Sequence, residues 1–160
     1  MNKMMVLEKD IFQSDQVRRI RNLINGMNHC CEDRNLIEKR KFSLPVAEMK
    51  CIILFGEEKY LTVKGISAKM NVAKSRVTKL IDNLSRRGLV KKISDPNDAR
   101  VKLICLSRRG KMLVEEIRKF QEKLYEEILS RFDDQERTHV LTNLEKLKTA
   151  MEDVRKKYQL

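Results

Sequence analysis

Positively charged and hydroxyl-bearing side chains crowd one segment of the sequence, and their chemistry is that of phosphate and base recognition. The stretch 62–110 contains 13 lysines and arginines against 3 acids, while the whole chain of 160 residues has a net charge of +12. Nearly all the excess positive charge therefore lies in less than a third of the chain. Because neutralising phosphates releases condensed counterions, a polyanion is the natural partner of such a segment.

Two short helices are expected to position these side chains. In the first, Val63, Ile66 and Met70 recur at helical spacing, with Thr62 as the expected N-cap. Asn71 follows, and asparagine tolerates the left-handed conformation that a tight turn needs. This pattern predicts a short amphipathic helix followed at once by a turn.

The second helix is predicted over residues 73–87, and its two faces differ in chemistry. Its expected buried face consists of Val77, Leu80, Ile81 and Leu84. The side chains expected to contact DNA are Lys74, Ser75, Arg76, Thr78, Lys79 and, at the far end, Arg86. Gly88 suits the left-handed position after the helix. The arrangement predicts a helix-turn-helix whose second helix enters the major groove of double-stranded DNA.

A basic hairpin is predicted directly after this helix. Leu89, Val90 and Ile93 begin a strand, residues 95–98 form a strong turn signal, and residues 100–106 form the returning strand. A basic hairpin in this position is a wing, and its tip, residues 94–100, can reach a minor groove.

The residues of these elements resemble the multiple-antibiotic-resistance regulator (MarR) family. The resemblance rests on S-R-V-T-K-L-I-D-N-L-S-R-R-G-L-V at 75–90, D-P-N-D-A-R at 95–100 and L-S-R-R-G at 106–110. It implies a dimeric winged-helix transcription factor, with Arg100 as the wing arginine, Asp98 positioning it, and a small aromatic effector. Ala99 and Ala73 depart from the family pattern, which often has a basic residue and a hydroxyl there.

The expected fold is mainly α with a small β-wing, formed by a single domain over residues 1–160. A winged helix-turn-helix DNA-binding lobe is expected over 43–106, with Ser43 as the N-cap of its first helix. Helical dimerisation regions are expected over 8–38 and 107–160. The last of their helices has a heptad seam at Val140, Leu144, Leu147, Met151, Val154 and Tyr158. Such a seam favours a homodimer over packing within one chain.

Other function classes find little support in the sequence. It has no glycine-rich phosphate loop, no nucleophile elbow and no C-x-x-C pair, so we expect neither an enzyme nor a cofactor nor a metal site. No apolar run approaches the roughly 20 residues that span a bilayer, and the first residues lack the apolar core of a signal peptide. We therefore expect a cytoplasmic protein that does not enter a membrane.

One cluster, His29-Cys30-Cys31-Glu32, admits three interpretations. Cys30 and Cys31 continue the apolar stripe of the first helix, so both could be small core residues. Alternatively, either thiol could sense oxidants, with a disulfide to a partner chain or to Cys51. Histidine, cysteine and glutamate could also bind zinc.

The sequence thus supports a dimeric, sequence-specific transcriptional regulator. We expect a repressor that binds a near-palindromic operator and is released by a small molecule or an oxidant. The alternative is an architectural or nonspecific DNA-binding protein that uses the same basic lobe without reading bases.

Overall fold

The protein is described by a computed structural model of residues 2–56, 58–95 and 101–158, with side chains from residue 14 onward. The chain divides into two compact units, Met1–Val114 and Glu115–Leu160. Helices dominate, and a small antiparallel sheet accompanies them, which confirms the predicted fold class. Among the residues described, no helix is both long and apolar enough to cross a membrane.

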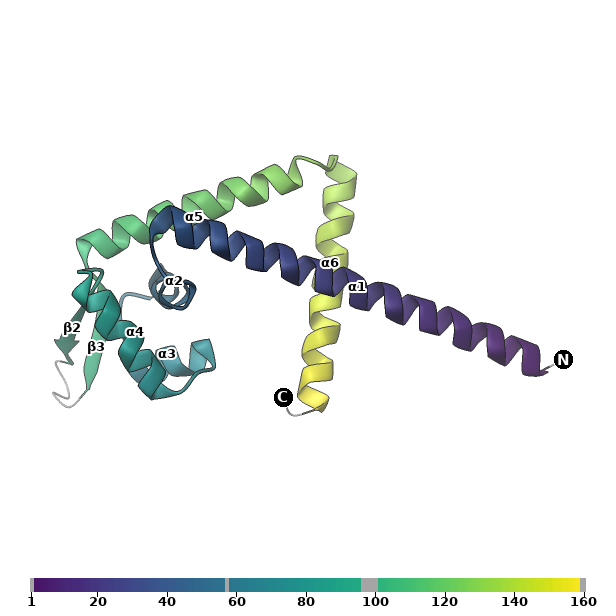
Figure 1. Cartoon of the computed structure of the whole chain (residues 1–160), viewed down its shortest axis with the longest axis horizontal. Coiled ribbons are helices and arrows are strands. Elements are labelled where there is room, and N and C mark those ends of the chain that lie inside the picture. The colour runs from purple at the N-terminus through teal and green to yellow at the C-terminus, as the bar shows by residue number, and fades with distance from the viewer. Residues whose placement is uncertain (1, 57, 96–100, 159–160) are drawn as a thin grey trace. The chain divides into compact units, whose positions relative to one another are not determined.

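The helices of the first unit surround one apolar core. Helix α1 (Asn2–Phe42) leads to α2 (Val46–Ile53), which continues as a short 3-10 turn, η1 (Leu54–Gly56). Helices α3 (Val63–Met70) and α4 (Lys74–Arg86) follow, and α2 contacts both of them (Figure 1). The apolar side chains that close this core include Met49, Ile52, Ile66, Val77, Ile81 and Leu84. The apolar face predicted for 73–87 is thus buried.

The junction between α1 and α2 differs from the prediction at Ser43. This residue does not cap α2; it adopts the left-handed conformation with φ 50°, and the N-cap of α2 is Pro45. The physical reason is that the residue before a proline is held out of the helical region, so a helix cannot run through Leu44. Ser43 instead follows the end of α1, where a left-handed residue is common. Helix α1 accordingly extends beyond the predicted 8–38.

The turn between α3 and α4 is built as predicted. The Thr62 hydroxyl oxygen accepts a hydrogen bond from the Gly65 amide at 3.0 Å, so Thr62 caps α3. Asn71 takes the left-handed conformation with φ 51°. A further bond, from the Ser67 hydroxyl to the Val72 carbonyl at 2.6 Å, ties α3 to this turn. The path of the chain into α4 is therefore fixed by local hydrogen bonds.

The sheet has three antiparallel strands in the order β1-β3-β2. They are β1 (Leu61–Thr62), β2 (Val90–Ser94) and β3 (Lys102–Leu106), so the predicted hairpin is present. In its register Val90 faces Leu106 and Ser94 faces Lys102. Gly88 precedes the hairpin with φ +70°, which confirms its predicted left-handed role. Strand β1 was not predicted, because two residues carry no alternation and depend on β3 for pairing.

Two long helices complete the chain, and α5 (Arg108–Leu129) passes from the first unit into the second. The Ser107 hydroxyl accepts a hydrogen bond from the Gly110 amide at 2.9 Å, as expected of a cap. Helix α6 (Asp134–Lys157) begins with a capping box in which Asp133 and Glu136 bond each other's backbone amides. Asp133 thus fixes the start of α6.

Candidate nucleic-acid interface

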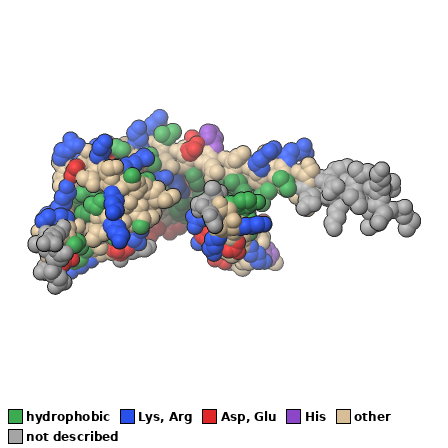
Figure 2. All heavy atoms as spheres, turned by 90° about the horizontal axis from the view of Figure 1, so that it is seen from below, with side chains coloured by type: hydrophobic (Ala, Val, Ile, Leu, Met, Phe, Trp, Pro, Cys, Tyr) green, Lys and Arg blue, Asp and Glu red, His purple; other side chains and the backbone are tan. Residues whose placement is uncertain are grey.

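Helix α4 presents two chemically distinct faces. Val77, Leu80, Ile81 and Leu84 are buried against the core. The five predicted side chains of its first two turns all lie exposed: Lys74, Ser75, Arg76, Thr78 and Lys79. Figure 2, a view from below that of Figure 1, shows lysine and arginine side chains at many places on this face of the molecule. The helix therefore offers cations and hydroxyls on a surface that its own core holds rigid.

The first turn of α4 lacks a side-chain cap. Its N-cap is Ala73, which cannot accept a hydrogen bond from the backbone amides of that turn. Thr78 donates its hydroxyl proton to the Lys74 carbonyl at 3.0 Å, so its oxygen and methyl group remain available outward. Unsatisfied amides and the positive end of the helix dipole both favour an anion here.

The remaining predicted DNA contacts are separated from this cluster. Arg86 is exposed in the last turn of α4, about two turns beyond Lys79, and donates a hydrogen bond to the Asn83 side-chain oxygen. Asp98 and Arg100 lie outside the described residues. The structure thus brings five of the predicted residues together on one end of α4 and places Arg86 at the other end.

The hairpin is tied to α4 by an ion pair that sequence reasoning missed. Lys92 of β2 contacts the Asp82 carboxylate of α4, with 2.5 Å between nitrogen and oxygen. Toward the tip, Lys102 donates to the Ser94 hydroxyl at 2.8 Å, and the Asp95 amide donates to the Val101 carbonyl at 3.0 Å. The one sequence signal was that Asp82 is the sole acid of an otherwise basic helix.

Sequence reasoning also missed a buried carboxylate that contacts α4. Glu48 of α2 is 4% exposed, and its Oε1 accepts a hydrogen bond from Asn83 Nδ2 at 2.9 Å. Its Oε2 lies 3.6 Å from Arg87 Nε. Arg87 in turn donates to the Ser43 carbonyl at 2.8 Å. The only signal in the sequence was an acid within the apolar run of residues 44–55.

The four cysteines occupy three environments, with Cys105 of β3 partly exposed. Cys30 and Cys31 are exposed on α1, so their interpretation as core residues of the single chain is wrong. Burial, reinforced by the Glu48 carboxylate, raises the pKa of the buried Cys51 thiol to about 11, which keeps it protonated and unreactive. The Nδ1 atom of His29 lies 3.8 Å from the Oε2 atom of Glu32. Across the described part of the chain, no three His, Cys, Asp or Glu side chains gather as metal ligands.

Comparison with known proteins identifies a family for this lobe. A sequence model of the MarR family matches residues 44–102, which include α2, α3, α4 and the hairpin. YsmB of Bacillus subtilis (strain 168), named as an uncharacterized HTH-type transcriptional regulator, is 32% identical over 76 residues. That match covers 48% of this chain and 52% of YsmB, so this chain spans about half the length of that relative.

The fold is shared with solved structures over most of the chain. A MarR family protein from Bacillus stearothermophilus is 25% identical, with a TM-score of 0.75, and the match covers 95% of this chain and 99% of that one. FabT of Streptococcus pneumoniae, solved in complex with DNA, is 20% identical with a TM-score of 0.76. That match covers 84% of this chain and 99% of FabT, and at this identity it establishes a common fold.

Proposed function

Because this chain belongs to the MarR family, we propose that it is a homodimeric transcriptional regulator, acting as a repressor at a near-palindromic operator. The winged-helix lobe over 43–106 binds DNA, and the helical regions over 8–38 and 107–160 join the two protomers. We place the protein in the cytoplasm, where the chromosomal DNA of its bacterial relatives lies. The family consists of transcriptional regulators rather than enzymes.

The observation that carries this proposal is the exposed, uncapped start of α4. Lys74, Ser75, Arg76 and Lys79 project from a helix whose opposite face is fixed in the core. In the major groove, Arg76 can bond the O6 and N7 atoms of a guanine, while Lys79 can bind a phosphate. A phosphate at the helix start would satisfy the amides that Ala73 leaves free.

The hairpin supplies a second contact in this proposal. Its tip, residues 94–100, would enter a minor groove, with Arg100 inserted and Asp98 holding it. Both residues lie outside the described part of the structure, so their roles come from the family resemblance. The Lys92–Asp82 ion pair supports the arrangement, since it fixes the start of the hairpin to α4.

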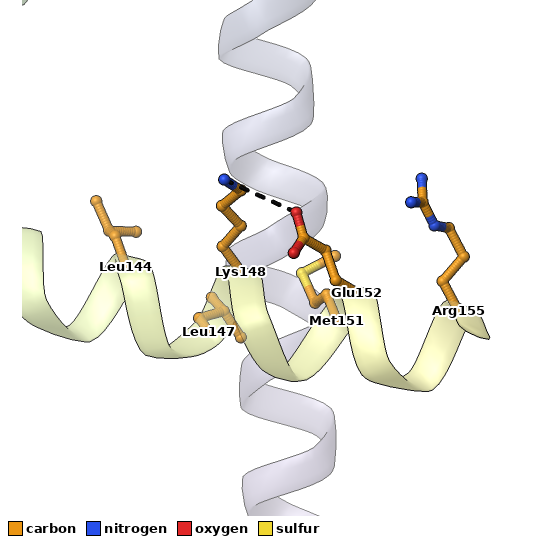
Figure 3. A pocket seen from close by; sticks show the side chains of 6 residues that line it. All are labelled: Leu144, Leu147, Lys148, Met151, Glu152 and Arg155. Carbon is orange, nitrogen blue, oxygen red and sulfur yellow. Dashed lines mark ion pairs between the residues drawn. The ribbon is translucent and has the colours of Figure 1, made fainter. Parts of the chain in front are cut away.

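Exposed apolar stripes support the homodimer. The stripe of α6 contains Leu144 at 46% exposure and Tyr158 at 66%, and the structure buries no residue of this helix. Figure 3 shows Leu144, Leu147 and Met151 along a hollow of α6, with the Lys148–Glu152 ion pair (3.7 Å) beside them. Helix α1 has a similar stripe at Val17, Ile20, Leu23 and Met27. A second copy of the chain would remove such stripes from water.

A two-fold dimer sets the geometry of the operator and of its control. The two copies of α4 would read half-sites about one helical turn, roughly 10 base pairs, apart.

A signal releases DNA only if it favours a different spacing of the two copies of α4. We propose a small aromatic effector as one signal. A hollow in the first unit is its candidate site, and its lining includes Phe55, Tyr60 and Leu106 together with the charged residues Glu58, Lys59 and Lys111.

Oxidation is the second proposed signal. Cys30 and Cys31 are exposed on α1, the helix with the apolar stripe, so a disulfide between protomers would change how the two copies pair. Peroxide is then expected to weaken DNA binding by the wild type but not by a Cys30→Ser, Cys31→Ser double variant. DNA binding is measured by fluorescence anisotropy of a labelled duplex. Equal responses of the two proteins to peroxide would show that these cysteines do not control DNA binding.

The replacement Arg76→Ala tests base reading by α4. We expect it to weaken binding to the preferred duplex by about 1–3 kcal/mol and to relax the sequence preference at one position of each half-site. Anisotropy titrations on the preferred duplex and on a scrambled duplex, over a range of salt concentrations, measure both effects.

The matched control is Lys123→Ala, which removes one exposed cation from α5 outside the winged-helix lobe. It should leave the ratio of specific to nonspecific affinity unchanged. If Arg76→Ala weakens all sequences alike and lowers only the salt slope, the protein binds DNA without reading bases at this residue, as an architectural protein would.

A further inference from the structure

Glu48 is a buried carboxylate whose hydrogen-bonding capacity the described residues only partly use. Its residue is 4% exposed, and its Oε2 accepts no hydrogen bond from the described residues. The nearest cation to that oxygen, Arg87 Nε, lies 3.6 Å away and belongs to a half-exposed side chain. Burying a carboxylate with incomplete partners costs free energy, and apolar replacements of similar volume are often neutral or stabilising. The presence of a carboxylate at this position is therefore better explained by the side chain that it orients.

The carboxylate determines which way the Asn83 amide points. An ionised carboxylate only accepts hydrogen bonds, so the Asn83 atom that faces Glu48 Oε1, 2.9 Å away, must be the donor Nδ2. The Oδ1 atom of the same amide then faces outward. There it accepts the hydrogen bond from the Arg86 guanidinium, which is exposed at the end of α4. A continuous relay thus runs from Glu48 through Asn83 to Arg86.

We propose that Glu48 is a positioning residue for DNA binding, which acts on the phosphate-contacting Arg86 through Asn83. This inference rests on the proposed function, because it requires that the protein binds DNA and that Arg86, one of the predicted DNA contacts, lies at a phosphate. A free arginine side chain samples many rotamers and loses that freedom when it binds. Holding the guanidinium in one orientation beforehand reduces this loss and is expected to tighten binding roughly three- to tenfold.

Two replacements of similar volume separate orientation from packing. Glu48→Met fills the same space but offers no hydrogen-bond acceptor, so the Asn83 amide is no longer fixed in one orientation. Glu48→Gln removes the charge but keeps an oxygen that can accept from Asn83 Nδ2. We expect Glu48→Met to melt at or above the wild-type temperature and yet to bind duplex DNA roughly three- to tenfold more weakly. Glu48→Gln should bind within about twofold of the wild type.

A double-mutant cycle with Arg86→Ala then tests the route of the effect. If Glu48 acts through Arg86, then Arg86→Ala and the double variant Glu48→Met, Arg86→Ala should bind DNA equally. Asn83→Ala interrupts the same relay from α4. It should weaken DNA binding as Glu48→Met does when Arg86 is present, and should have no further effect in the Arg86→Ala variant. It therefore replaces Glu48→Met in the cycle if Glu48→Met fails to fold. Affinities come from anisotropy titrations at one salt concentration, and folding from thermal melts followed by circular dichroism.

Three outcomes would overturn the proposal. The first is that Glu48→Met binds as tightly as the wild type. The second is that it weakens binding by the same factor with and without Arg86. The third is that Glu48→Gln and Glu48→Met are equally impaired, since an acceptor would then be irrelevant. Wild-type protein that binds no duplex at all would contradict the proposed function itself, which distinguishes that failure from a failure of the relay.

Discussion

Replacing Gly110 by alanine is expected to lower the free energy of unfolding by at least about 2 kcal/mol. A Cβ atom at this position would lie 2.0 Å from the Leu89 carbonyl oxygen and 3.3 Å from a methyl group of Leu106. The obstacle is backbone, so it cannot rotate away. The same carbonyl accepts a hydrogen bond from the Ser107 amide at 2.9 Å, so a shift of the chain would also weaken the start of α5.

Urea denaturation followed by circular dichroism measures this loss. Gly26→Ala is the matched control, because a Cβ atom there meets nothing within 4 Å in the chain. It should stabilise α1 by about 0.5–1 kcal/mol, since alanine favours a helix interior over glycine. A Gly110→Ala variant as stable as the wild type would show that the close approach of Leu89 to α5 is absent in solution.

Placing a carboxylate on the apolar stripe of α6 is expected to dissociate the homodimer. In Leu144→Asp, two-fold symmetry places the charge in the interface twice. Burying an unpaired carboxylate costs several kcal/mol, and about 1.4 kcal/mol is a factor of ten in an equilibrium constant. The dissociation constant should therefore rise about 100-fold or more, and affinity for a two-half-site operator should fall with it.

Sedimentation equilibrium measures the dimer directly. Thr149→Asp is the control, because 3.6 residues per turn place Thr149 on the side of α6 opposite this stripe, where it is exposed. It should leave the dimer intact. A monomeric wild type, or equal dissociation constants for the two variants, would exclude α6 from the interface.

Local patterns made the winged-helix lobe predictable from sequence. Apolar spacing located α3 and α4, and single residues with a defined backbone preference, Thr62, Asn71 and Gly88, marked their ends. These signals depend on neighbours within a few residues. The exposed cluster at the start of α4 follows from the same spacing, since the buried positions leave the others facing outward.

Other features were misjudged or missed, either because two local preferences compete or because distant residues decide the outcome. The Ser43 cap was wrong because the restriction imposed by Pro45 outweighs the capping preference of serine. From sequence alone, Glu48 is indistinguishable from a solvated residue of a helix. Its hydrogen bond to Asn83, 35 positions later, becomes visible only in the structure. Cys30 and Cys31 continue an apolar stripe, but the structure buries neither within one chain.

Selection of bound duplexes from a random DNA pool, with reduced wild-type protein at near-physiological salt, tests the central claim that α4 reads DNA bases as part of a two-fold dimer. We predict enrichment of one near-palindrome whose half-sites lie roughly 10 base pairs apart. The absence of any enriched sequence, together with binding that disappears steeply as salt rises, would contradict base reading and favour nonspecific binding by the basic lobe.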